Sequence, residues 1–477
     1  APPGRSPSGR PRPGRPAMIV DLPREGRTSA RPLSSVPEPA AGTPGRPLPA
    51  WPLYALFAIY PVWWALGMTS IIWALAAAPM AWLLMRKRRI QVPPGFGIWV
   101  LFLVWAVAGA ASLGLVAPGT MPNSGGFLGF AQRIVLYTAA TVMFLYIGNL
   151  TEERMPLRRL ARLLGLLGIM TVIGGVAGIL FPEVSFVSPV EMLLPKSMTS
   201  SKWVEDMVHP GLAQVQDVVG ASNARPKAPF EYTNIWGNNL VVLMVWVFVG
   251  WWATGSRGAK WAVALLAVVA AIPTVYSLNR AMWLGIVIAV LYVAFRLMLQ
   301  GRLFVLGVLA LGLIVGMLVF ALSPLSTMVK ARAENGHSDN IRSTLALRSV
   351  EAAASSPVLG YGSGRALRGS PSSIAIGRTP TCEQCGNSTV GSTGQLWLLL
   401  ISNGFVGTAL FFGFFLHSLW RYRHDRTAYG IGGSLVVLLS FWFSTAYTSA
   451  GSPLSLTFVS LALLWRSDQA RRQREIG

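Results

Sequence analysis

The stretch TVYSLNRAMWLGIVIAVLY, residues 274–292, places an arginine, Arg280, between two apolar runs that are each long enough to enter a bilayer. A helix of about 20 apolar residues spans the hydrocarbon core of a membrane. The few residues around Asn279 therefore predict a tight hairpin between two membrane helices, with Arg280 at the membrane surface.

The rest of the chain has the same apolar character. Hydrophobic residues make up 53% of it and charged residues only 12%, as expected of an integral membrane protein. We expect an all-α, polytopic membrane protein with about twelve transmembrane helices. The predicted spans are residues 52–67, 69–85, 96–117, 128–148, 163–181, 234–253, 261–278, 281–297, 303–323, 394–416, 428–447 and 453–465.

The net charge of +22 resides in the connectors and tails rather than in the spans. Short connectors rich in Lys and Arg mark the cytoplasmic side of a membrane protein. Both termini are therefore expected in the cytoplasm, which an even number of spans allows, and no nucleic-acid partner is expected. Examples are Arg86, Lys87, Arg88, Arg89, Arg154, Arg158, Arg159, Arg162, Arg257, Lys260, Arg296, Arg302, Arg421, Arg423, Arg426, Arg466, Arg471, Arg472 and Arg474.

Residues 1–50 are rich in Pro, Arg, Gly and Ser, which predicts a disordered, basic cytoplasmic tail. The transmembrane domain is expected over residues 51–465, and residues 466–477 are expected to form a second cytoplasmic tail. The first tail has no cleavable signal pattern, so the span that begins near Trp51 is expected to direct membrane insertion.

With this topology only two extracytoplasmic loops are long, residues 182–233 and 324–393, and long loops are usually functional. The cytoplasmic connectors are too short to hold a nucleotide-binding domain, and no Walker-type loop occurs in the sequence. ATP-driven transport by this chain alone is therefore not expected. The glycine-rich GYGSGR, residues 360–365, predicts a turn.

The position of Arg280 allows two interpretations. The side chain can extend to water at the membrane interface as an anchor. Alternatively, it can hold a phosphate that emerges from the outer leaflet, because a guanidinium group binds phosphate oxygens through paired hydrogen bonds. Position alone does not separate the two.

Four stretches resemble the bacterial O-antigen ligase and O-antigen polymerase family, GT-C-like membrane glycosyltransferases whose donor is a polyprenyl-diphosphate-linked glycan. RPKAPFEYTNIWGNNL (225–240) is similar to the segment in which an arginine, a phenylalanine and an asparagine lead into a span. SLNRAMWLGI (277–286) looks like the arginine motif at the start of the next span. DNIRSTLALRSVEAAASSPVLGYGSG (339–364) resembles an amphipathic helix, opened by an arginine, before a PxxGxG turn. GQLWLLLISNGFVGTALFF (394–412) is similar to the re-entry into the membrane.

The resemblance implies a glycosyltransferase in the bacterial plasma membrane. Its partners would be the polyprenyl-diphosphate-linked glycan, a glycan or other cell-envelope acceptor, and the lipid bilayer, and no cofactor is expected. Ligases of the family carry a histidine late in the large loop, where this chain has TVGSTGQLW (389–397). Only His209 and His337 are expected outside the membrane, which favours a polymerase or a transferase with another acceptor.

The donor already contains a good leaving group, so catalysis requires mainly alignment and stabilisation of the charge on the departing diphosphate. We assign Arg280 and Arg225 to the diphosphate, with Arg342 and Arg348 as helpers. The last two are six residues apart, about 240° around a helix, so at most one is expected to face the donor.

A general base would speed deprotonation of the acceptor hydroxyl. The candidates are Glu231, His337 and Asp339, and Glu231 is preferred because it lies between Arg225 and the next span. A competing interpretation pairs Glu231 with Arg225 or Lys227 in a loop salt bridge. His337 lies among turn-forming residues and is also interpreted as a surface histidine.

Asn234 and Trp283 are assigned to substrate binding, since Asn234 belongs to a matched motif and Trp283 can stack on a sugar. No metal site is expected, because no cluster of His and carboxylate residues has ligand spacing. Cys382 and Cys385 are interpreted as a local disulfide in an oxidising compartment, or as half of a zinc site.

Two other functions remain open. A transporter or flippase for lipid-linked glycans would use the same arginines to bind and release the diphosphate, but it needs polar groups along a path through the membrane. A membrane scaffold would tolerate replacement of the outer arginines.

Overall fold

A computed structural model describes residues 47–122, 126–199, 202–217, 222–301, 307, 337–367 and 389–476. The predicted tail up to residue 46, all but one residue of the predicted span 303–323, and both Cys382 and Cys385 lie outside the described residues. The chain is mostly helical, as predicted.

The helices form the body of the structure, and the strands are confined to short antiparallel pairs, β1 with β2 and β3 with β4. The helices are α1 (Trp51–Phe57), α2 (Tyr60–Ala65), α3 (Ile72–Met85), α4 (Phe96–Ala108), a 3₁₀ turn (Gly109–Ser112), α5 (Phe127–Gly148), α6 (Leu157–Leu180), α7 (Pro189–Leu193), α8 (Lys196–Thr199), α9 (Lys202–Val208), α10 (Thr233–Val247), a π-helical turn (Phe248–Trp252), α11 (Arg257–Tyr276), α12 (Arg280–Met298), α15 (His337–Ser355), α16 (Gln395–Tyr422), α17 (Ala428–Ala446) and α18 (Ser452–Ile476). The strands are β1 (Ala213–Asp217), β2 (Ser222–Pro226), β3 (Arg365–Ala366) and β4 (Thr389–Val390).

Within the described ranges, seven helices are long and apolar enough to cross a membrane: α5, α6, α10 with its π-helical turn, α11, α12, α16 and α17. Each coincides with a predicted span. The chain is therefore compatible with a multi-pass membrane protein.

The other predicted spans differ from the structure. The span 52–67 is divided into the short helices α1 and α2, because α2 begins with a proline in its first turn and proline cannot continue a preceding helix. The spans 69–85 and 96–117 contain shorter apolar helices, α3 and α4 with its 3₁₀ turn. The span 453–465 lies within α18, which does not end there but continues to Ile476, so the expected second tail is helical.

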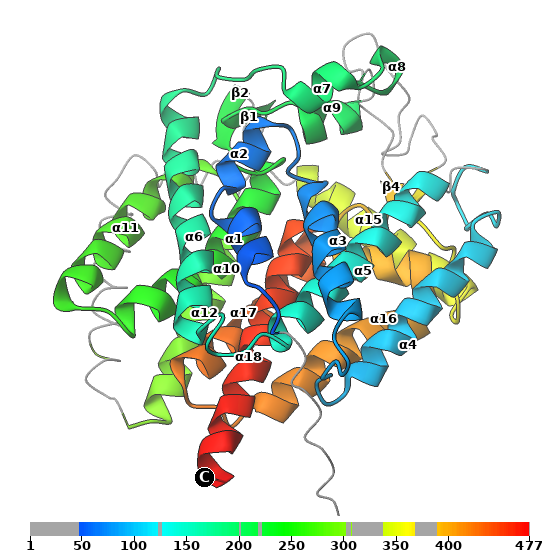
Figure 1. Cartoon of the computed structure of the whole chain (residues 1–477). Coiled ribbons are helices and arrows are strands. Elements are labelled where there is room, and N and C mark those ends of the chain that lie inside the picture. Colours follow the sequence, from blue (N-terminus) through cyan, green and yellow to red (C-terminus); the bar gives the residue numbers. More distant parts are fainter. Residues whose placement is uncertain are drawn as a thin grey trace, which may run out of the picture. The chain divides into compact units, whose positions relative to one another are not determined.

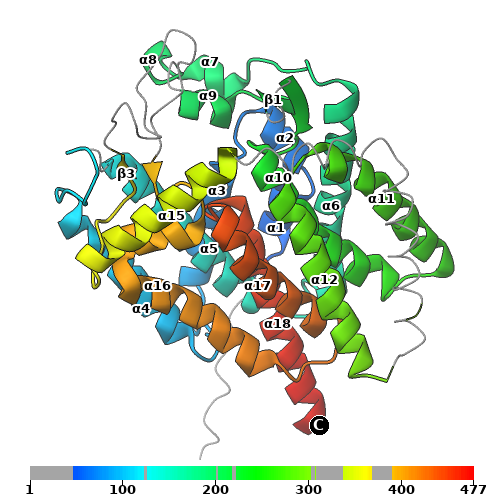
Figure 2. The same ribbon diagram turned by 180° about the vertical axis from the view of Figure 1, so that it is seen from behind.

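The connectors rich in Lys and Arg contact one another at one end of the helices, which we call the basic end. Representative contacts are Lys87 Nζ to the Asn149 carbonyl (3.1 Å), Arg158 to the Thr254 carbonyl (2.7 Å), Arg296 to the Asp425 carbonyl (2.5 Å) and Arg466 to Glu152 (2.8 Å). The last turns of α18 lie at this end, and α7, α8, α9, β1 and β2 lie at the opposite end (Figures 1 and 2).

An aromatic cluster joins α4, α5, α16 and α18 in the core. The fully buried ring of Trp99 lies 5.6 Å from the ring of Phe411 and 4.7 Å from that of Phe458. Its indole N–H donates to the Thr141 hydroxyl at 2.7 Å. A buried donor without a partner is costly, so this hydrogen bond lets a tryptophan occupy the apolar interior.

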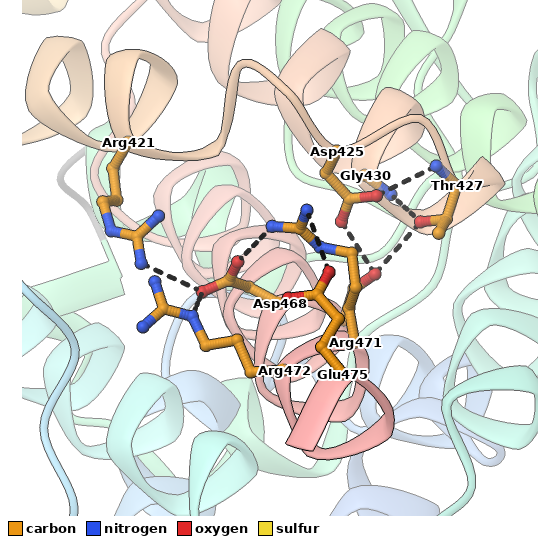
Figure 3. Close-up of polar contacts among 9 residues, drawn as sticks. Arg421, Asp425, Thr427, Gly430, Asp468, Arg471, Arg472 and Glu475 are labelled. Carbon is orange, nitrogen blue, oxygen red and sulfur yellow. Dashed lines mark hydrogen bonds and ion pairs between the residues drawn. The ribbon is translucent and has the colours of Figure 1, made fainter. Parts of the chain in front are cut away.

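A buried carboxylate ties α16 to α18 at the basic end. Asp468 is 4% exposed and accepts hydrogen bonds from Arg421 (3.3 Å), Arg471 (2.8 Å) and Arg472 (2.9 Å). Figure 3 shows the carboxylate between the three guanidinium groups. One negative charge thus offsets part of the repulsion among three cations.

We expect Asp468→Asn to lower the free energy of unfolding by about 1–3 kcal/mol, because the arginines lose their shared carboxylate. Thermal unfolding of the purified protein in detergent measures the change. Glu475→Gln is the control, since Glu475 is exposed and contacts Arg471 only at 3.8 Å. Equal melting temperatures for both variants would contradict the prediction.

The turn after α15 fits into an interruption of α16. Gly404, inside α16, has a φ of +64°, which breaks the helical hydrogen bonding. The backbone N–H groups of Tyr361 and Gly362 donate to the carbonyls of Ile401 (2.7 Å) and Ser402 (2.9 Å). The carbonyls released by the break are therefore satisfied, as an apolar environment requires. The predicted turn is confirmed, and it serves to join α15 to α16.

We expect Gly360→Ala to destabilise the protein by at least about 2 kcal/mol. Gly360 has a φ of +69°, and a Cβ atom there would lie 2.6 Å from the backbone nitrogen of Asn403. Gly413→Ala in α16 is the matched control, because its nearest contact would be at 3.9 Å. Comparison of the two variants in thermal unfolding tests the prediction, and equal stability would contradict it.

Candidate functional site

The predicted hairpin between α11 and α12 is confirmed. Its turn contains Leu278, which is buried and has a φ of +50°, a left-handed conformation that is rare for a leucine. The Oδ1 atom of Asn279 accepts the N–H of Met282 at 3.1 Å and so caps α12. The hydroxyl of Tyr447, directly after α17, donates to the same oxygen. Arg280 begins α12 at this turn and is half-buried.

Arg225, in β2, lies against the hairpin. Its side chain is 7% exposed, and its Nε atom donates to the carbonyl of Ser277 at 2.6 Å. Nη2 of the same guanidinium lies 3.4 Å from Oδ1 of Asn234 in the first turn of α10. The hydroxyl of Thr233 lies 3.4 Å from the Arg225 carbonyl. Strand β2, the start of α10 and the hairpin are thus joined by one arginine.

Arg342, near the start of α15, reaches the same region from another direction. Its guanidinium donates to the carbonyl of Ala446, the last residue of α17, at 3.1 Å, and the residue is exposed. Ala446 directly precedes Tyr447, whose hydroxyl donates to Asn279 of the hairpin. Arg342 therefore lies beside the connector that contacts the hairpin.

We call Arg225, Arg280 and Arg342, together with Asn234, the arginine cluster. The sequence assigned the three arginines to the diphosphate and Asn234 to substrate binding. In the structure Arg225 contacts both the hairpin and Asn234, and Arg280 begins α12 at the hairpin. Arg342 contacts the end of α17, next to the residue that bonds to the hairpin. Guanidinium groups have the chemistry to bind phosphate oxygens through paired, charge-assisted hydrogen bonds.

Glu231 lies between Arg225 and Asn234 in the sequence, but its side chain contacts the α2–α3 connector instead of the hairpin. Its carboxyl is 7% exposed, and the Ser70 hydroxyl donates to its Oε1 atom at 2.6 Å. Burial raises the pKa of Glu231, while hydrogen bonds from Ser70 and Thr69 and the charge of Lys227 lower it. Its Oε2 atom has no hydrogen-bond partner among the described residues. The preferred base therefore faces the α2–α3 connector.

The carboxyl of Glu231 lines a small pocket, which also involves Thr69, Asp206 and His209. The pocket encloses about 10 Å³, roughly the space of one water molecule. Nδ1 of His209 lies 2.8 Å from a carboxylate oxygen of Glu191, so this histidine is held by a local partner. Water in the pocket would give the buried carboxyl a route for proton exchange.

Two other predicted site residues have partners of their own within the protein. Arg348 is exposed and pairs with Glu351 at 2.7 Å. Arg342 and Arg348 therefore have different partners, as expected from their separation of about 240° around the helix. The indole N–H of Trp283 donates to the carbonyl of Thr274 at 2.9 Å, which fixes the ring against α11.

His337 and Asp339 belong to the first turn of α15, but their side chains are not among the described parts of the structure. No group of three or more His, Cys, Asp or Glu residues in the described ranges could hold a metal ion.

Sequence reasoning missed the contribution of Tyr447, because it is the last residue of a predicted span and hydropathy does not mark it. The capping role of Asn279 does have a signal in the sequence, since Asn is favoured immediately before a helix.

Arg365, outside the predicted site, is 1% exposed and donates to the carbonyls of Tyr361 (2.7 Å) and Leu113 (2.9 Å). These contacts make it a structural arginine.

The described part of the chain is mostly helical and compatible with a multi-pass membrane protein, and the arginine cluster lies at the end of the helices opposite the basic end. No protein-family model, no curated protein and no solved structure matches the chain.

We expect the stability of the wild type to fall as pH rises from 4.5 through the raised pKa of Glu231, because ionising a buried carboxyl favours the unfolded state. Glu231→Gln removes this term, so the variant should be more stable than the wild type at neutral pH and show a weaker pH dependence. Thermal unfolding between pH 4 and 8 measures both effects.

Glu183→Gln is the matched control, because Glu183 is an exposed carboxylate in the same connector. It should leave the slope unchanged. A Glu231→Gln variant with the wild-type slope would show that Glu231 does not carry the raised pKa.

Proposed function

We propose that this protein is a membrane glycosyltransferase that transfers a glycan from a polyprenyl-diphosphate-linked donor to a glycan or other cell-envelope acceptor. The observation that carries the proposal is the position of Arg225, Arg280 and Arg342 at or beside the α11–α12 hairpin, at the end of the bundle opposite the basic end. The sequence resemblance to the O-antigen ligase and polymerase family supports the same reaction.

Orientation follows from charge. The basic end collects the short connectors rich in Lys and Arg, so the positive-inside rule places it in the cytoplasm and the arginine cluster on the extracytoplasmic face of the plasma membrane. With about twelve spans, both termini would then be cytoplasmic. A lipid-linked diphosphate would meet the cluster at the membrane surface, with its tail in the bilayer.

The arginines suit the leaving group of such a donor. In the transfer, the acceptor oxygen forms a bond to the anomeric carbon, the bond from that carbon to the diphosphate oxygen breaks, and its electron pair remains on the diphosphate. Guanidinium groups that bind this charge more tightly as it develops lower the barrier. Arg225 and Arg280 are assigned this role, with Arg342 assisting and Asn234 orienting Arg225.

The acceptor hydroxyl must lose its proton during the transfer. Glu231 is the proposed base, because burial raises its pKa and so makes its ionised form a stronger proton acceptor. It lies three residues before Asn234, on the opposite side of the segment, so the acceptor would approach from the α2–α3 connector. A water molecule in the pocket beside Glu231 would relay the proton away from the carboxyl.

The test is transfer by the purified protein in nanodiscs, with a polyprenyl-diphosphate oligosaccharide from the source organism's membrane as donor and its cell-envelope extract as acceptor. The wild type should lengthen or attach glycan. Arg225→Ala and Arg280→Ala should each lower the rate by about 100-fold or more, the usual loss when one charge-stabilising donor is removed.

Arg257→Ala, an exposed arginine at the start of α11, is the matched control and should retain the wild-type rate. Arg280→Lys keeps the charge but not the paired hydrogen bonds, so an intermediate rate is expected. Wild-type rates for Arg225→Ala and Arg280→Ala would overturn the role of the cluster. Absence of transfer by the wild type, with donor binding intact, would favour the transporter or scaffold.

A further inference from the structure

The connector between α17 and α18 carries a network of neutral polar groups beside the arginine cluster. It begins at Tyr447, whose hydroxyl donates to Asn279. The remaining contacts are the Gln395 N–H to the Tyr447 carbonyl (2.8 Å), the Ser449 N–H to Gln395 Oε1 (3.1 Å) and Asn239 Nδ2 to Ser452 Oγ (2.8 Å). The network thus links α10, the α11–α12 hairpin and α16.

Four side-chain atoms in or next to this network are buried and have no hydrogen-bond partner within the described part of the chain: Asn239 Oδ1, Asn279 Nδ2, Thr393 Oγ1 and Ser449 Oγ. Asn239 is fully buried and Asn279 is 4% exposed. Each buried polar atom without a partner costs about 1–3 kcal/mol, and proteins retain such atoms mainly where function uses them. Four in one network therefore point to a ligand.

The chemistry of these atoms indicates which ligand groups fit. The set contains an amide donor, an amide acceptor and two hydroxyls, and none of its members is charged. Phosphate oxygens only accept hydrogen bonds, so they would be repelled by the Asn239 carbonyl oxygen. Sugar hydroxyls both donate and accept, and they match all four atoms.

The location suits a sugar attached to a diphosphate. Asn279 immediately precedes Arg280, and Tyr447 lies between the Arg342 contact at Ala446 and Ser449. Asn239 follows Asn234 by five residues on α10, about 7.5 Å along the helix axis. Asn279 and Ser449 therefore belong to the turn and the connector next to the contacts of Arg225 and Arg342.

We infer that Asn239, Asn279, Thr393 and Ser449 form a hydroxyl subsite that binds the sugar attached to the diphosphate. This inference rests on the proposed function, since the arginine cluster must hold the diphosphate. The cations would provide affinity for any polyprenyl diphosphate, and the hydroxyl subsite would select the glycan.

Ser449→Ala and Thr393→Val test the inference with little risk to folding, because each removes a hydroxyl that makes no described hydrogen bond. Binding to the full-length protein in nanodiscs is measured with two probes, undecaprenyl diphosphate and the undecaprenyl-diphosphate-linked oligosaccharide of the source organism. Each variant should bind the oligosaccharide probe about 5-fold more weakly and the sugar-free probe as the wild type does. Ser434→Ala is the matched control, since its buried hydroxyl also lacks a partner but lies in the first half of α17.

Equal weakening of both probes would place the hydroxyls on the diphosphate and overturn the sugar assignment. Wild-type binding of both probes by the Ser449→Ala and Thr393→Val double variant would overturn the subsite and leave the proposed function intact. If the wild type binds neither probe, the proposed function itself fails, and the subsite fails with it.

Discussion

The side-chain amide of Asn279 is the contact on which the arrangement of the candidate site depends. The turn it closes contains no glycine, and Leu278 occupies a left-handed conformation that costs a non-glycine residue about 1–2 kcal/mol. The cap on Met282, the hydroxyl of Tyr447 and the burial of Leu278 offset that cost. The turn then fixes where α12 begins, and Arg280 is its first residue.

Two arginines of the cluster interact with helix C-termini. Arg225 donates to the Ser277 carbonyl after α11, and Arg342 donates to the Ala446 carbonyl at the end of α17. A cation at this position is stabilised by the helix dipole, so these contacts contribute to the fold without any ligand. Arg365, by contrast, donates to carbonyls that surround it inside the protein. The two cluster arginines therefore stabilise helix ends, whereas Arg365 joins the turn after α15 to the residues after the 3₁₀ turn.

Hydropathy and charge predicted the parts of the fold that depend on local sequence. Seven predicted spans are long apolar helices, and the hairpin at Asn279 is present. The helix before the PxxGxG turn, which is α15, is implied by the family resemblance rather than by hydropathy. The contacts that position the site join residues far apart in the chain, such as Arg342 with Ala446 and Ser70 with Glu231. The periodicity of a sequence does not say which helices pack together. The direction in which the Glu231 side chain points therefore could not be predicted from the residues next to it in the sequence. The division of the first predicted span has a local cause, the proline in the first turn of α2. A hydropathy average over the whole span does not reveal this proline.

The distribution of polar groups also bears on the choice between transfer and transport. Several polar side chains in the middle of the described helices are neutral and hydrogen-bonded to neighbouring helices, as in Trp246 with Ser460 and Trp236 with the Thr171 carbonyl. Cationic side chains of these helices gather near their ends, as Arg280 and Arg296 do at the two ends of α12. A diphosphate that crossed the bundle would have to leave its cations, and an unpaired ion in a low-dielectric interior costs several kcal/mol. A diphosphate that stays at the arginine cluster remains paired with the guanidinium groups. The charge pattern therefore favours chemistry at one membrane face over movement of the headgroup between faces.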